Sequence, residues 1–369
     1  MNGIYLDWNA TAPLRPEARA ALIACMEEVG NPSSVHGFGR AARRRVEDAR
    51  EAVARLAGAT SADVIFTGSG TEANNLALRV KGRARLIVSA TEHAAVLDAA
   101  SDAEVVPVGP KGLVDLEALE RVLAADSGPA LVSIQAVNNE TGVIQPLAEV
   151  VRIAKAQGAL VHSDAVQAVG RIPFDMGALG LDMATLSAHK IGGPQGVGAL
   201  VARPGLMLDP LLRGGGQERR IRAGTENVAG IAAFGAAAAA ALEGLDNYTR
   251  LAVLRDGLEE RVREAAPDAV IFGADAPRVA NTSCIALPGL TAETQLMAFD
   301  LAGIAVSSGA ACSSGKVRAS HVLTAMGAPV ELAGSAIRVS LGWSSTSEEV
   351  DRFIQAWVRQ YGRSRDRRA

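Results

Sequence analysis

Cysteine is scarce in this sequence. Its 369 residues include three cysteines, Cys25, Cys284 and Cys312. An odd and sparse set of cysteines excludes a disulfide framework and is typical of proteins from a reducing cytoplasm. The sequence has no CxxC motif and no Cys/His pair at metal-ligand spacing, which argues against a bound metal. We therefore expect a cytoplasmic protein with no metal site.

Long apolar segments and an excess of one charge are also missing. The most apolar stretch, residues 228–242, is uncharged, but it is shorter than the ~18–20 apolar residues that a membrane-spanning helix needs. Residues 1–13 have neither the basic start nor the apolar centre of a signal peptide. The net charge is −3, so nothing favours nucleic acid or a membrane surface as a partner.

The composition that is present, with 49% hydrophobic and 21% charged residues, is that of a globular protein. The length suggests roughly two domains of about 150 residues each. Expected strands and helices alternate along the first two-thirds, which predicts an α/β fold with a mostly parallel sheet covered by helices on both faces. Ligands of such sheets bind outside the carboxyl ends of the strands. The expected strands are 63–67, 85–89, 130–136, 159–162, 183–187 and 198–202, and a helix is expected at 147–158.

The last third follows a less regular pattern. A charged helix at 247–264 is suited to connect two domains. The alternation in IRVSL at 337–341 predicts a half-exposed strand. Ser345 and Glu348 predict a capping box at the start of the final helix. Further elements are expected as strands at 282–287 and 304–307 and a helix at 293–301.

A glycine-containing turn follows the first expected strand. Residues 68–73 read Gly-Ser-Gly-Thr-Glu-Ala, and amides at such a helix start can bind a phosphate. The same residues fit a degenerate dinucleotide fingerprint, because Glu92 lies about twenty residues further on. An ordinary glycine turn is a third interpretation. The turn alone does not choose among them.

Polar residues that could carry chemistry follow three other strands. His93 follows 85–89, Asp164 follows the strand that contains His162, and Lys190 follows 183–187 among glycines. Each has an ordinary alternative: a structural histidine, a helix N-cap, and a surface lysine. Gln167 would lie on the same side as Asp164 if a helix starts there. Near a phosphate site and a fixed acid, Lys190 becomes a candidate for a Schiff-base lysine.

Cys312 differs from the other two cysteines in its surroundings. It lies in SSGAACSSG at 307–315, a loop of small and polar residues. Cys25 and Cys284 lie in apolar segments expected to be a helix and a strand, where cysteines are usually buried and structural. A loop cysteine without partner cysteines is a reactive thiol or a tolerated surface residue.

Taken together, these residues meet the needs of pyridoxal phosphate: a lysine for the imine, an acid for the ring nitrogen, a phosphate site and a stacking ring. The chain resembles the cysteine desulfurases, a class-V aminotransferase branch of the fold-type I pyridoxal-phosphate enzymes. The resemblance extends over nearly the whole chain. Its motifs are YLDWNATAP (5–13), GNPSSVH (30–36), SGTEANN (69–75), TEH (91–93), VNNETG (137–142), SDAVQAVG (163–170), SAHKIGGPQG (187–196), GGGQERRIRAGTEN (214–227), SSGAACSSG (307–315) and SAIRVSLGW (335–343).

The resemblance implies an activity and a cofactor. The enzyme would be a sulfurtransferase that converts L-cysteine to L-alanine and leaves the sulfur as a persulfide on Cys312, for iron–sulfur clusters or other sulfur-containing cofactors. Its partners would be L-cysteine, a sulfur-acceptor protein (an iron–sulfur scaffold or a sulfur carrier) and a second copy of the chain. The large cofactor-binding domain would span 15–250, and the small domain 1–14 and 251–369.

The resemblance also implies residue roles. Lys190 would hold the cofactor as a Schiff base and act as the base, and Cys312 would be the nucleophile. His93 would stack on the ring and move protons. Asp164 would face the ring nitrogen and Gln167 the phenolic oxygen. The phosphate would be bound by Gly70, Thr71, Ser187, His189 and, from the partner subunit, Thr225; Asn139 would contact both cofactor and substrate, and Arg338 would bind the substrate carboxylate.

Two features of this chain qualify the resemblance. The chain ends soon after its last expected helix, whereas housekeeping iron–sulfur members have a longer C-terminal segment that docks the scaffold. The first motif reads ATAP where many relatives have ATTP. The length between Cys312 and SHVL (320–323) fits the group with a long cysteine loop. A selenocysteine lyase and a catalytically silent relative are the alternative functions, and the intact set of Lys190, Asp164 and His93 argues against the second.

Overall fold

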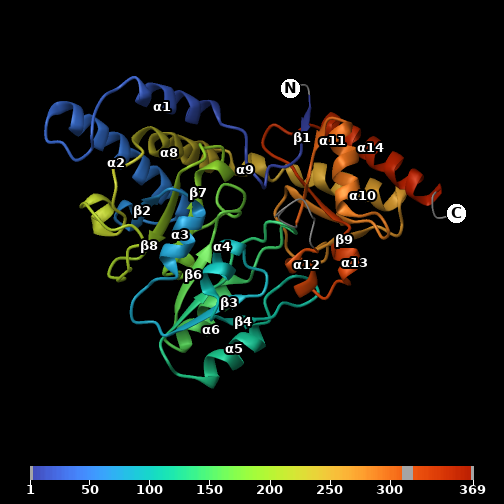
Figure 1. Ribbon diagram of the computed structural model, residues 1–369, viewed down its shortest axis with the longest axis horizontal. Helices are drawn as coiled ribbons and strands as arrows, with labels where there is room; N and C mark the ends of the chain where they lie inside the picture. Colours follow the sequence, from blue (N-terminus) through green and yellow to red (C-terminus); the bar gives the residue numbers. More distant parts are fainter. Residues whose placement is uncertain (1–2, 310–318, 367–369) are drawn as a thin grey trace.

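The larger of two regions is built on a seven-stranded sheet in the order β2-β8-β7-β6-β5-β3-β4 (Figure 1). The structure is a computed structural model that describes residues 3–309 and 319–366. Only β8 runs antiparallel to its neighbours, so the expected mostly parallel sheet is confirmed. The strands are β2 Val64–Thr67, β3 Arg85–Ser89, β4 Glu104–Val106, β5 Ala130–Ser133, β6 Leu160–Asp164, β7 Met183–Ser187 and β8 Gly198–Ala202.

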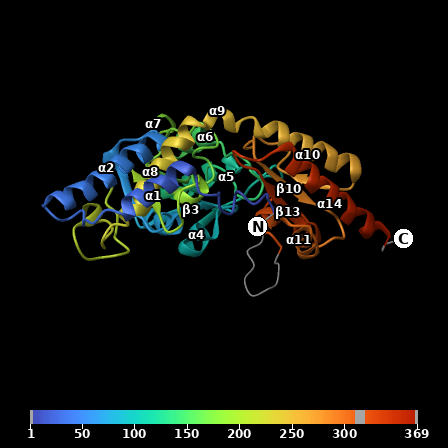
Figure 2. The same ribbon diagram turned by 90° about the horizontal axis from the view of Figure 1, so that it is seen from above.

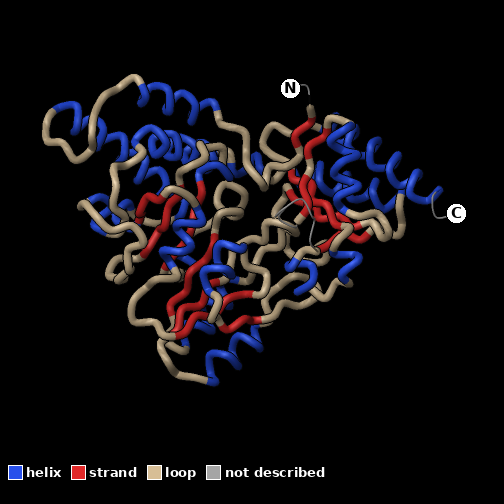
Figure 3. The backbone as a smooth tube through the Cα atoms, in the orientation of Figure 1, coloured by secondary structure: helices blue, strands red, loops and turns tan. Residues whose placement is uncertain are grey.

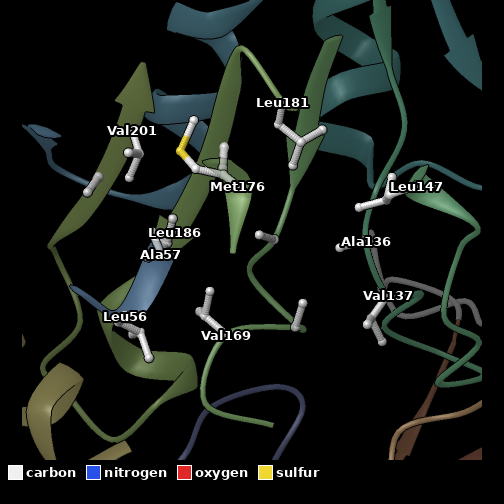
Figure 4. Close-up of a cluster of buried hydrophobic side chains, with 14 of the residues drawn as sticks. Leu56, Ala57, Ala136, Val137, Leu147, Val169, Met176, Leu181, Leu186 and Val201 are labelled. Atoms are coloured by element: carbon white, nitrogen blue, oxygen red, sulfur yellow. The ribbon is translucent and has the colours of Figure 1, made fainter. Parts of the chain in front are cut away.

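Helices cover both faces of this sheet because its strands are apolar on both sides. On β2, Phe66 belongs to one apolar cluster and Ile65 to another on the opposite face. Figure 4 shows part of the larger cluster, where Leu186 and Val201 of the sheet lie near Leu56 and Met176. The helices are α1 Pro16–Met26, α2 Gly37–Ala57, α3 Gly70–Ala77, α4 Ala94–Leu97, α5 Leu116–Ala125, α6 Leu147–Ala156, α7 Met176–Leu179 and α8 Val228–Glu243.

The alanine-rich segment forms α8 and packs tightly against α2. A Cβ added at Gly235 would lie 2.5 Å from the Cα of Ala49, so only small residues allow the two helices to approach this closely. No single helix in the described residues is long and apolar enough to cross a membrane. The bent pair formed by α8 and Leu245–Ala265 is long and apolar enough to do so, by length and composition alone.

The smaller region contains a four-stranded antiparallel sheet in the order β12-β13-β10-β9. Figure 3 shows strands of this region in red, with helices in blue beside them. The N-terminal strand β1, Ile4–Tyr5, pairs with β11, Ile304–Ala305, so the start of the chain lies in this region. Figure 2 shows α9 and α10 running from the larger region towards it. The other elements are β9 Val270–Phe272, β10 Thr282–Ala286, β12 Ser307–Ser308, β13 Ala336–Ser340, α9 Leu245–Tyr248, α10 Leu251–Ala265, α11 Ala292–Leu301, α12 His321–Ala325, α13 Val330–Ala333 and α14 Ser347–Asp366.

Two expectations for the C-terminal third are wrong. Strand β13 is buried on both faces, not half-exposed, because its polar residues face the N-terminal segment and the cavity instead of solvent. The hydroxyl of Ser340, for example, accepts a hydrogen bond from the amide of Asn9 at 3.0 Å. The capping box at the start of α14 is formed by Thr346 and Glu349, which exchange backbone-to-side-chain hydrogen bonds. Ser345 instead accepts from the amide of Gly342.

Element boundaries differ in smaller ways. The expected helix at 247–264 is divided into α9 and α10, and the expected strand at 304–307 into β11 and β12. The proposed domain limits, 15–250 against 1–14 with 251–369, stay a prediction. The separate apolar cluster around Phe299, Phe353 and Trp357 in the smaller region agrees with a second unit of packing.

Candidate active site

A cavity of about 810 Å³ lies between the two regions. Its walls come from the carboxyl ends of the parallel strands, from the N-terminal segment and from β13. This is where an α/β sheet binds its ligands. The predicted residues that line it are Gly70, Thr71, His93, Asn139, Asp164, Gln167, Ser187, His189, Lys190 and Arg338.

Lys190 ends the short 3₁₀ turn that follows β7. Its Nζ donates hydrogen bonds to the carbonyl oxygens of Asn9, at 2.7 Å, and Ala10, at 2.9 Å. Burial, helped by the positive charges of Arg338 and Arg171, lowers the pKa of Lys190 to about 7. A large fraction of this amine is therefore neutral near pH 7, and the neutral amine is the form that attacks a carbonyl.

Asp164 is the last residue of β6 and is fixed by two hydrogen bonds. Its Oδ2 accepts from the side-chain amide of Asn74, on α3, at 2.7 Å, and its Oδ1 accepts from the amide of Val166 at 3.0 Å. Gln167 follows in a turn, not in a helix. Its Nε2 donates to the carbonyl oxygen of Asn9, whereas its buried Oε1 has no partner among the described residues.

The glycine turn at the start of α3 brings backbone close to backbone. A Cβ at Gly198 would lie 2.4 Å from the carbonyl carbon of Ser69. Residue 198 must therefore be glycine for strand β8 to lie this close to the turn. The Ser69 hydroxyl caps α3 by accepting from the amide of Glu72. The first amides of α3 lie beside Ser187 and Thr71 at the cavity wall, which makes this the natural anion site of the cavity.

The histidines divide into two kinds. His189 hydrogen-bonds the hydroxyl of Thr11, and burial, with the charge of Lys190, lowers its pKa to about 4. His93 caps α4 through its Nδ1 and opens onto the cavity; its pKa is lowered, mainly by loss of solvent. His162 is fully buried between the hydroxyls of Ser133 and Thr185, which is the structural role that a lone histidine usually has.

Arg338 forms the opposite wall of the cavity. Its Nη2 donates to the carboxylate of Asp7 at 2.7 Å and its Nη1 to the carbonyl oxygen of Asn139 at 3.1 Å. Its buried Nε has no partner among the described residues. A guanidinium held in this way retains donors that can bind a carboxylate in the cavity.

Glu92 cannot bind a ribose, as the dinucleotide interpretation would require. Its side chain is fully buried and its Oε1 accepts from the amide of Gln135 at 2.7 Å. Burial raises the pKa of Glu92 well above its usual range.

Sequence reasoning missed several residues of the cavity. Most of them lie within motifs of the family, so those motifs could have identified them. Those missed are Asn9, Asn74, Gln135, Glu140 and His321.

Two predicted residues are not among the described residues that line this cavity. Thr225 is exposed and does not line it. Cys312 lies outside the described residues, so its role stays a prediction.

The chain matches the family model "Aminotransferase class-V" over residues 4–353. It is 44% identical to a cysteine desulfurase of Cereibacter sphaeroides, covering 96% of this chain and 95% of the relative. It is 42% identical to an IscS-like cysteine desulfurase of Mycobacterium tuberculosis, covering 98% and 97%. A solved NifS-like protein from Rickettsia africae is 40% identical and superposes with a TM-score of 0.92 over 98% of this chain and all of that one.

The chain therefore belongs to the class-V aminotransferases, a pyridoxal-phosphate-dependent family. Within that family, its place is among the cysteine desulfurases.

The site fits pyridoxal phosphate on its own geometry. The close turn at the start of α3 would offer amides to the phosphate, and Gln167, whose Nε2 uses one N–H on the carbonyl oxygen of Asn9, would have its second N–H to donate to a ring oxygen. Asp164, fixed by two hydrogen bonds, would be the carboxylate for a ring nitrogen, and the amine of Lys190 lies in the same cavity.

Proposed function

We propose that this enzyme removes the sulfur of L-cysteine, with Lys190 and Cys312 as its two reacting groups. In the balanced reaction, the Cβ–S bond of cysteine breaks and an S–S bond to Cys312 forms. The products are L-alanine and a Cys312 persulfide, and the two hydrogens of the thiols are retained between them. The Cβ carbon is reduced while the two sulfurs are oxidised to the persulfide, so no external oxidant is needed.

One observation carries the proposal. A lysine with a pKa of about 7, a fixed aspartate and an arginine all line one cavity between the two regions. Amino-acid chemistry on pyridoxal phosphate requires an amine, a carboxylate for the ring and a donor for the substrate carboxylate. When bound, pyridoxal phosphate supplies an electron sink that stabilises negative charge at the substrate Cα.

The residues of this chain then have distinct tasks. Arg338 binds the substrate carboxylate and thereby orients the Cα–H bond. The neutral Nζ of Lys190 removes the Cα proton as a general base. His93, also at the cavity, moves protons to and from the reacting atoms. The thiolate of Cys312 attacks the substrate sulfur.

The test is the fate of the sulfur. After brief exposure to cysteine without reductant, mass spectrometry should find one added sulfur on the peptide that contains Cys312. The Cys312→Ser variant should bind cofactor and cysteine and yet make almost no alanine from cysteine. Added sulfur on Cys25 or Cys284, or wild-type turnover by Cys312→Ser, would contradict the mechanism. Retained activity of Cys312→Ser on selenocysteine alone would favour the selenocysteine lyase alternative.

We also propose that the functional unit is a homodimer in which Thr225 contacts the phosphate of the partner subunit. The segment before it is held in an unusual conformation, with positive φ at Glu218, Arg219 and Arg220. Glu218 is fixed by two hydrogen bonds from Arg50 and one from the amide of Phe66. Such anchoring supports a segment that presents an exposed residue to another molecule.

Thr225→Val should therefore weaken cofactor retention without changing the folded structure of the subunit. The measurement is cofactor content after dialysis, compared with sedimentation of the same sample. A fully active monomer would refute the dimer. Full cofactor retention by Thr225→Val would refute the contact.

The cellular setting follows from the same activity. We propose a cytoplasmic enzyme, with neither nucleic acid nor membrane as a partner, that passes its persulfide sulfur to an iron–sulfur scaffold or a sulfur carrier. The supporting observations are the names of the IscS-like and NifS-like relatives and the sparse cysteines. Co-purification of an acceptor with the persulfide-loaded enzyme tests this proposal.

A further inference from the structure

Glu140 is a buried glutamate that has no role in the proposed reaction. It lies in the loop between β5 and α6, it is 1% exposed, and it lines the cavity. Burial raises its pKa, although the hydrogen bond from Ser320 and the charges of His321 and Arg338 act in the opposite direction. Burying a carboxyl group costs free energy unless hydrogen bonds or opposite charges compensate it, and such a group in a cavity is a candidate for a functional role.

The loop that carries Glu140 is rigid. The Oδ1 of Asn138 accepts hydrogen bonds from the amides of Glu140 and Thr141, each at 2.9 Å, and from the Thr141 hydroxyl. Gly142 closes the turn with a φ of 75°, a conformation that favours glycine. The side chain of Glu140 therefore projects from a fixed backbone.

Glu140 contacts the chain on both sides of residues 310–318. On the far side, the hydroxyl of Ser320 donates to its Oε2 at 2.5 Å. The same hydroxyl accepts from the amide of Leu323, so Glu140 also orients the first turn of α12. On the near side, a Cβ added at Gly309 would lie 1.8 Å from the same Oε2, so the backbone at 309 rests directly against the carboxyl group.

These two contacts arise independently, one from a hydrogen bond and one from close packing. They converge on a single oxygen atom at the cavity wall. Cys312 lies in the sequence between the two contacted residues. The described residues on either side of 310–318, Gly309 and Ser320, therefore both contact Glu140.

We propose that Glu140 is a positioning residue for sulfur transfer, which holds Gly309 and Ser320 so that the segment carrying Cys312 starts and ends at fixed points beside the cavity. This inference rests on the proposed desulfurase function. It assigns Glu140 to the second half of the reaction, the attack on sulfur, and not to the binding of cofactor or cysteine. This role requires the hydrogen bond that the Glu140 side chain accepts and the volume that it fills. It does not require Glu140 to transfer a proton.

The first experiment compares Glu140→Ala with Glu140→Gln in the holoenzyme. The alanine variant should keep its visible cofactor absorbance and a KM for cysteine within about threefold, while kcat falls about 10- to 100-fold, since misplacing a reacting group by about 1 Å costs on that order. The glutamine variant can still accept the Ser320 proton through its Oε1, so its kcat should recover most of that loss. A glutamine variant as slow as the alanine variant would overturn the positioning role in favour of a proton-transfer role.

Asp63→Ala is the matched control. Asp63 is also buried, and its carboxylate accepts from the hydroxyl of Thr60 at 2.7 Å at the start of the 3₁₀ turn Ser61–Asp63, away from the cavity. It tests the general cost of losing a buried carboxylate–hydroxyl bond. If kcat of Glu140→Ala falls no further than that of Asp63→Ala, the inference is wrong.

Gly309→Ala gives a second route if Glu140→Ala fails to fold. Its added methyl group should displace the Glu140 carboxyl group and lower kcat, again with cofactor and KM retained. In the Glu140→Ala background the same change should add little, because the two act through one contact. Additive losses, or no loss from Gly309→Ala, would overturn the inference. A wild-type enzyme that makes no alanine from cysteine would instead overturn the proposed function itself.

Discussion

The two sheets position their functional residues in different ways. On the seven-stranded sheet, Asp164 ends β6 and Lys190 follows β7, so each owes its place to the end of its own strand. On the four-stranded sheet, Arg338 lies in the middle of β13, paired in register with Cys284 and Ser307. Its ionic partner, Asp7, is 331 residues away in sequence.

Under the proposed function, this difference would separate the chemistry from the recognition of substrate. The seven-stranded sheet would provide the groups that hold and activate the cofactor, because its parallel strands bring their ends to one edge. The smaller region would provide the donor for the substrate carboxylate. Changes in the first region should therefore stop the reaction, whereas changes in the second should weaken binding.

The strongest challenge to this comparison is Lys190→Ala. Under the proposed function it would remove both the covalent link to the cofactor and the base, so alanine production should fall at least about 1000-fold, because a general base alone contributes 10²–10⁴-fold. Borohydride treatment followed by peptide mapping measures the link. Lys111→Ala, at an exposed lysine, is the control and should behave as wild type. A borohydride-reducible cofactor that persists in Lys190→Ala would contradict the assignment.

Arg338→Ala tests the other side of the cavity. Loss of charge-assisted hydrogen bonds to the substrate carboxylate should cost about 2–3 kcal/mol, or about 30- to 150-fold in kcat/KM, mostly through KM. Cofactor absorbance should persist. Arg338→Lys keeps the charge without the planar fork and should lose less. If Arg338→Ala instead lost its cofactor with KM unchanged, the division between the two regions would fail.

The smallest effect is expected from Cys284→Ala. Cys284 is 1% exposed, and burial raises the pKa of its thiol well above its usual range, so it is not a nucleophile. Trimming it should lower the free energy of unfolding by about 1 kcal/mol, measured by urea denaturation, and leave kcat within about twofold. A large change in KM would show that β13 transmits small packing changes at Cys284 to Arg338, which would sharpen the comparison.

Local patterns predicted six of the seven strands of the larger sheet and missed only β4, Glu104–Val106. Apolar runs bounded by glycine and polar residues predicted β3, β7 and β8 with their observed limits, and strand ends then indicated Asp164 and Lys190. The candidate site residues were predicted from neighbouring residues in the sequence or from motifs of a known family. Both kinds of pattern span only a few residues.

The errors came where the environment is set by distant residues. The alternation in β13 has the form of a half-exposed strand, but its polar side faces Asn9 and Asp7 of the N-terminal segment, so both faces are buried. The capping box was displaced by one residue because Ser345 bonds Gly342 instead of opening the helix. No periodicity contains that information.

The sequence by itself determined the alternating fold, the family and the identity of the lysine and acid at the strand ends, because strand propensity, glycine turns and motifs act over short distances. Only the tertiary structure decided that Asn74 holds Asp164, that Asp7 holds Arg338, and that Glu140 contacts both Gly309 and Ser320. These contacts join segments that meet only when both sheets have formed. Hydrogen bonds and burial depend on that proximity, and proximity across hundreds of residues is a property of the folded chain.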